Sequence, residues 1–144
     1  MTRLTQALSA WALGVAVAAV SCVPLFFPAF SKGRSIVLAV LLYSFCAGLD
    51  FLLFHLPVGL AARGRLAGLG SGARIALAGV LGIPGFLFLL SRFESFDYGY
   101  SVLLQPATWA FLLPFLLGGT AVLAFLARSG EGDEHRGHLR VGQP

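Results

Sequence analysis

Only two side chains inside the long apolar runs of this sequence are of a type that does acid–base chemistry at neutral pH. Asp50 and His55 lie in one such run, whereas the other Asp, Glu, Lys, Arg and His residues lie in or beside polar segments. A charge near the centre of a bilayer costs at least about 2.5–3.5 kcal/mol, so an acidic residue there is a candidate functional residue. On a regular helix, five residues at about 100° each place Asp50 and His55 roughly 140° apart, and we expect no pair between them.

Three roles are open for Asp50: an interhelical hydrogen bond that fixes register, a proton- or cation-handling site, and a polar contact with a partner subunit. No Lys or Arg lies within the apolar runs to neutralise it, so the carboxyl group is either protonated or faces a wet cleft. When positions on antiparallel helices are matched by their depth in the membrane, the Thr120 hydroxyl and the Trp11 indole lie at the level of Asp50, in a zone rich in glycine. We expect one of these two groups to share a hydrogen bond with Asp50, and Tyr43 to follow the same helical stripe.

His55 is expected to lie near the lipid headgroups and to reach toward them. A haem or metal role would need further ligands, and no other apolar run carries a histidine. Cys22 and Cys46 form no C-x-x-C motif and are interpreted as small apolar residues. His135 and His138 are three residues apart near the C-terminus, but flanking glycines favour a solvated tail over a metal site. We therefore expect neither a metal nor a cofactor.

The composition indicates which elements must position these residues. Of 144 residues, 58% are hydrophobic and 11% are charged, compared with about 45–50% and 25% in soluble domains. This excludes soluble enzyme folds, disulfide-rich secreted domains and disordered chains. Four apolar runs approach or exceed the roughly 20 residues that cross a bilayer: Leu4–Phe27, Ser35–Leu60, Ile75–Ser91 and Pro106–Ala127.

Short connections between these runs predict an all-α integral membrane protein, an antiparallel up-and-down bundle of four transmembrane helices. This domain covers residues 1–128, and residues 129–144 form a flexible polar tail. A cleaved lipoprotein signal is an alternative for the first run, since Ala19-Val20-Ser21-Cys22 resembles such a site. The run stays apolar as far as Phe27, which favours a membrane span.

Prolines and small residues shape the predicted helices. Each run contains proline, and Pro24, Pro57, Pro84 and Pro114 are expected to kink or end their helices. Small residues at four-residue spacing allow close helix packing, mainly within the monomer, with contact to another chain as an alternative. These residues are Ala10, Gly14, Ala18 and Cys22 in the first run, and Gly72, Ala76, Ala78 and Gly82 in or just before the third.

Basic residues predict the orientation. With a cytoplasmic N-terminus, seven basic residues lie inside and three outside, which satisfies the positive-inside rule and places the C-terminus inside as well. The inner set is Arg3, Arg63, Arg65, Arg74, Arg128, Arg136 and Arg140, and the outer set is Lys32, Arg34 and Arg92. Arg63, Arg65 and Arg74 share one loop without acidic residues and are candidates for lipid headgroup contact. The net charge of +4 does not form the clustered basic and aromatic face of a nucleic-acid-binding protein.

The sequence contains no nucleophile and base set, phosphate-binding loop or zinc-binding helix, so we expect no enzyme activity and no soluble substrate. The preferred hypothesis is an accessory, assembly or scaffold subunit of a membrane complex, self-associated or packed against other membrane subunits. The alternative is a small transporter or proton- or ion-conducting protein that uses Asp50. A membrane enzyme acting on lipid has only Asp50, His55 and Tyr43 to offer and is the weakest hypothesis.

Overall fold

Every secondary-structure element in the described part of the chain is a helix, which confirms the all-α class. The computed structural model describes the backbone of residues 2–26, 36–92 and 109–141, and the side chains of residues 2–25, 36–91 and 109–129. The elements are α1 (Arg3–Phe26), α2 (Ile36–Asp50), the π-helical turn η1 (Phe51–His55), α3 (Leu56–Ala61), α4 (Arg63–Gly68), α5 (Ser71–Arg92) and α7 (Leu113–Val141).

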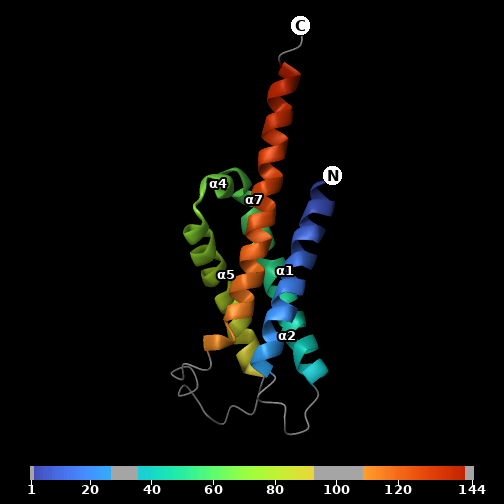
Figure 1. Ribbon diagram of the computed structural model, residues 1–144, viewed down its shortest axis with the longest axis vertical. Coiled ribbons are helices and arrows are strands. Elements are labelled where there is room, and N and C mark those ends of the chain that lie inside the picture. The colour runs from blue at the N-terminus through green and yellow to red at the C-terminus, as the bar shows by residue number, and fades with distance from the viewer. Residues whose placement is uncertain (1, 27–35, 93–108, 142–144) are drawn as a thin grey trace.

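The long helices run alternately up and down (Figure 1). The start of α1, the short helix α4 and the end of α7 all lie at one end of the bundle, and α7 extends beyond the other helices there. Helix α1 packs against α2 and α7, and α5 also packs against α2 and α7. The four long helices therefore close a ring, and the segment formed by α2 and η1 supplies the buried side chains of Asp50 and His55.

Three helical segments are long and apolar enough to cross a membrane: Arg3–Leu25, Ile36–Ala61 and Ser71–Ser91. They agree with the first three predicted spans, although the third begins four residues earlier than predicted. In the described part of the fourth run, the apolar helix Leu113–Ser129 is shorter. The predicted start of this run at Pro106 lies outside the described residues, as do Lys32 and Arg34, so a fourth span remains a prediction.

Two segments expected to lack regular structure are helical. Helix α4 lies within the predicted second loop, where Leu66 packs in one cluster with Leu123 and Ala127 of α7, and α5 begins in the same loop at Ser71. Helix α7 continues to Val141, so the backbone of most of the predicted tail is helical. The flexibility of that tail remains a prediction.

Small residues line the contact between α1 and α7, as their spacing predicted. Ala10, Ala18 and Cys22 are completely buried. A Cβ built on Gly14 would lie 3.1 Å from the backbone oxygen of Gly118 on α7, so the two backbones approach closely only because both positions are glycine. On α5, Ala78 is buried, whereas Gly72 has no atom within 4 Å of an added Cβ and faces outward.

Large apolar side chains cover the outside of the bundle. Val20 on α1, Phe45 on α2 and Val80 on α5 are each more than 60% exposed. Such a surface is unfavourable in water, because exposed apolar area is driven out of contact with solvent. Together with the three apolar helices, it indicates a membrane protein.

Candidate functional site

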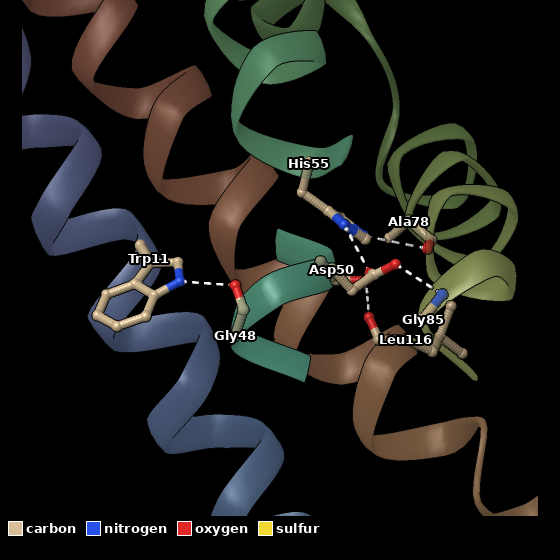
Figure 2. A network of polar contacts seen from close by, with 8 residues as sticks. Trp11, Gly48, Asp50, His55, Ala78, Gly85 and Leu116 are labelled. Atoms are coloured by element: carbon tan, nitrogen blue, oxygen red, sulfur yellow. Dashed lines mark hydrogen bonds and ion pairs between the residues drawn. The ribbon is translucent and has the colours of Figure 1, made fainter. Parts of the chain in front are cut away.

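The π-helical turn η1 brings Asp50 and His55 together, contrary to the expectation from a regular helix. The N–H of Leu56 bonds to the carbonyl of Phe51, five residues earlier, instead of four. Such a turn contains more than four residues, so residues five positions apart lie closer to one face of the helix than they do on a regular α-helix. His55 Nδ1 consequently lies 3.2 Å from Asp50 Oδ2 (Figure 2). The predicted separation of about 140° is wrong because it assumed unbroken α-helical geometry.

Pro57 provides a physical reason for the wide turn. A proline in an α-helix has no N–H to donate and its ring collides with the carbonyl four residues earlier, here that of Leu53. A π-helical turn immediately before the proline moves that carbonyl away from the ring. The sequence signal for the Asp50 and His55 pair was therefore present in the position of Pro57, two residues after His55.

Asp50 is also bonded to the third long helix. Its Oδ1 accepts a hydrogen bond of 2.9 Å from the backbone N–H of Gly85 on α5. Pro84 precedes this glycine, and a proline ring loosens the helical bonding around it. A Cβ on Gly85 would lie only 2.5 Å from the Asp50 Cβ, so glycine is needed for the approach. Pro84 was predicted to kink or end its helix, but the N–H of Gly85 was not anticipated as the partner of Asp50.

His55 joins the same helices through its second ring nitrogen. Its Nε2 lies 3.3 Å from the backbone oxygen of Ala78 on α5. A carbonyl oxygen only accepts hydrogen bonds, so this contact requires the proton to be on Nε2. No sequence signal marks Ala78, because the acceptor is a backbone atom.

The pair is enclosed by packed side chains and close backbones. Asp50 is 2% exposed and His55 is fully buried. The ring of Phe51 meets the His55 ring edge to face, with centroids 5.0 Å apart. A Cβ on Gly119 of α7 would collide with His55 Nε2, so this glycine lets α7 close over the imidazole. The expectation that His55 reaches toward the headgroups is wrong, because η1 turns it into the bundle.

The two facing atoms of the pair lie close together without forming a well-aligned hydrogen bond. Asp50 Oδ2 and His55 Nδ1 have no hydrogen-bond partner within the described residues, although they are 3.2 Å apart. The contact couples the two groups electrostatically.

The two groups predicted to bond to Asp50 bond elsewhere, so that prediction is wrong. The Trp11 indole N–H donates to the Gly48 carbonyl at 2.8 Å (Figure 2). The Thr120 hydroxyl donates to the carbonyl of Leu116 in its own helix at 2.7 Å. Depth matching placed these residues at a shared level but did not decide which way each side chain points.

Tyr43 lies on the same helix as the pair and bonds to a different part of the bundle. It is fully buried, its hydroxyl donates to the Phe111 carbonyl, and its ring packs on Phe115 with centroids 5.1 Å apart. Tyr43 therefore joins α2 to the start of the last helix.

The remaining candidate residues lie outside this centre. Arg63 donates to the side-chain oxygen of Gln6 at 2.8 Å, which ties α4 to α1. Headgroup contact by Arg63, Arg65 and Arg74 remains a prediction. Among the described side chains, no three metal-ligating residues lie together.

Two apolar pockets lie along the seam between α1 and α2. Both are lined by Trp11 and Leu52, one continuing toward Phe45 and the other toward Leu4. Neither is lined by Asp50 or His55. These two pockets are on the outer side of the bundle and do not lead to the polar centre.

Comparison of the chain with known protein families, with curated proteins and with solved structures finds no match.

Proposed function

We propose that this protein is a non-catalytic accessory or assembly subunit of a membrane complex, with four membrane spans and both termini in the cytoplasm. The observation that supports it most is how the interior polar groups are used. Trp11 links α1 to α2, and Asp50 and His55 link α2 to α5. These groups connect helices, and Asp50 and His55 are enclosed, which suits a structural body better than a transport path.

The apolar exterior of the bundle supports the same proposal. Side chains on α1, α2 and α5 offer broad apolar surfaces, and large exposed apolar patches typically mark contact with lipid or with other chains. An accessory subunit would use part of this surface for neighbouring membrane helices and leave the rest to lipid.

Purification from native membranes in a mild detergent tests this proposal. We expect other membrane chains, or further copies of this one, to co-elute reproducibly. A photoreactive residue at Phe45 or Val80, both strongly exposed, should cross-link to a second chain. The matched control is a photoreactive residue at the buried Phe51, which should cross-link only within the chain. A lone monomer with no cross-links from any outer face would contradict the proposal.

The proposed orientation requires a separate test. Single cysteines at Gly64 and at Arg34, in a variant without Cys22 and Cys46, should react with a membrane-impermeant thiol reagent from opposite sides of the membrane. Gly64 should be labelled only after the cytoplasmic side is opened, because its neighbours are basic. The reverse labelling pattern would show that the orientation in the membrane is the opposite of the one proposed.

A second candidate function is the handling of a proton or small cation by Asp50. The observation that favours it is the contact of Asp50 Oδ2 with His55 Nδ1, two buried atoms without another partner in the described chain. Ion flux into vesicles that contain the purified protein tests this candidate. Flux that collapses in Asp50→Asn would establish it, and absence of flux in the unaltered protein would exclude it.

A further inference from the structure

The pair formed by Asp50 and His55 also carries an inference that does not depend on the accessory role. We propose that the two side chains bind one proton in common, between Asp50 Oδ2 and His55 Nδ1, and so form an electrically neutral unit inside the bundle. The ligand of this site is a proton, and the residues that position it are Gly85, Ala78 and the π-helical turn.

The hydrogen-bond partners determine how many protons the pair holds. Asp50 Oδ1 accepts from the Gly85 N–H at 2.9 Å, so this oxygen carries no proton toward α5. His55 Nε2 faces the Ala78 carbonyl at 3.3 Å, so Nε2 carries one. The remaining atoms are Nδ1 and Oδ2, at 3.2 Å.

One proton between these two atoms satisfies both of them. Without it, the lone pair of Nδ1 would face a carboxylate oxygen, which is repulsive. With it, the unit is either an imidazolium beside a carboxylate or a neutral imidazole beside a carboxylic acid, and both forms have zero net charge. With two protons the unit would be a cation without a counterion.

The surroundings offer no charge that could replace the shared proton. Of the helices packed against the pair, α5 between Ile75 and Ser91 and α7 between Leu113 and Ala127 carry no titratable side chain. The other titratable side chains within the spans are Cys22 on α1 and Tyr43 and Cys46 on α2, none of which supplies a positive charge. An unbalanced carboxylate in this interior would be strongly disfavoured.

Exchange of the shared proton with water requires the bundle to open. The Phe51 ring packs against the imidazole in a T-shaped contact, and the backbone of α7 at Gly119 lies directly against the outer ring nitrogen. His55 is fully buried and Asp50 is 2% exposed.

Nitrogen NMR of the histidine ring in lipid nanodiscs shows which ring nitrogens of His55 carry a proton. The substitutions His135→Asn and His138→Asn leave His55 as the single histidine without touching the bundle. We expect a protonated Nε2, since this nitrogen faces the Ala78 carbonyl oxygen, which can only accept a hydrogen bond.

Infrared spectroscopy of the carboxyl group shows whether Asp50 carries a proton. The substitutions Asp97→Asn and Asp133→Asn leave Asp50 as the single aspartate, which can then be labelled with carbon-13. The proposal expects one of two results: a protonated Nδ1 with an ionised Asp50, or an unprotonated Nδ1 with a protonated carboxyl band. Asp50→Asn, the matched control, should remove the labelled band.

Two combinations of signals would overturn the proposal. A neutral imidazole together with an ionised Asp50 would mean that no proton is shared. An imidazolium together with a protonated carboxyl would mean that the unit carries a net positive charge. Because these spectra are recorded without a substitution in the bundle, the result does not depend on whether Asp50→Asn folds.

Discussion

Replacing Gly85 by alanine tests the contact between α5 and Asp50 directly. A Cβ built on Gly85 lies 2.5 Å from the Asp50 Cβ and 2.6 Å from its Cγ. Because Cβ is the first atom of the Asp50 side chain, a change of rotamer cannot move it away. Helices α2 and α5 must therefore separate to accommodate the new methyl group.

Two effects contribute to the expected loss of stability. Overpacking a close helix contact costs about 1–3 kcal/mol, and losing the hydrogen bond from the Gly85 N–H to a carboxyl group costs about 1–3 kcal/mol. The effects overlap, since both arise when the helices move apart, and we expect Gly85→Ala to lower the free energy of unfolding by about 2–4 kcal/mol. An average hydrogen bond between membrane helices contributes only about 0.6 kcal/mol.

Unfolding in mixed micelles, driven by an ionic detergent and followed by tryptophan fluorescence, measures this difference. Gly72→Ala is the matched control on the same helix, because no atom lies within 4 Å of its added Cβ. Alanine favours the helix over glycine, so the control should be neutral or more stable by up to about 1 kcal/mol. If Gly85→Ala lost no more than about 0.6 kcal/mol, the close approach of α5 to Asp50 would be refuted.

Three further substitutions test the other contacts of the centre. Trp11→Phe removes the indole donor between α1 and α2 and should cost about 0.6–1.7 kcal/mol in the same unfolding assay; no change would mean that this bond contributes nothing. Gly119→Ala places a methyl group against the His55 ring and should cost about 1–3 kcal/mol, while a stabilised variant would show that α7 does not close over the imidazole. Pro57→Ala restores an N–H and permits a regular helix, so it should separate Asp50 from His55 and change the His55 ring nitrogen signal in NMR. An unchanged signal would show that the proline does not cause the π-helical turn.

Hydrophobicity along the chain was sufficient to find the three long apolar helices. Each must bury about 20 residues in hydrocarbon and satisfy its backbone internally, so its extent is encoded locally. The fourth helix was harder to delimit, because its described apolar part begins at Leu113 and its helical backbone continues through the polar residues as far as Val141. The glycines and charged residues of this stretch predicted a solvated tail. These residue types do not by themselves determine where a helix ends.

The ionisable residues of the interior were also identifiable from the sequence. Asp50 and His55 are the only Asp, Glu, Lys, Arg or His residues within the apolar runs, and this follows from residue type and position alone. The small residues of α1 were likewise predicted to pack inside the bundle, because their four-residue spacing places them on one face.

Only the tertiary structure decided which groups these side chains meet. One π-helical turn rotates His55 onto the face of Asp50, and the partners across the helix contact are the backbone atoms of Gly85 and Ala78. Sequence reasoning gave depth along the membrane but not rotation about each helix axis, which is why Trp11 and Thr120 were chosen wrongly. Rotation depends on how the helices pack against one another and on local departures from α-helical geometry, and neither is contained in the hydrophobic pattern of a single helix.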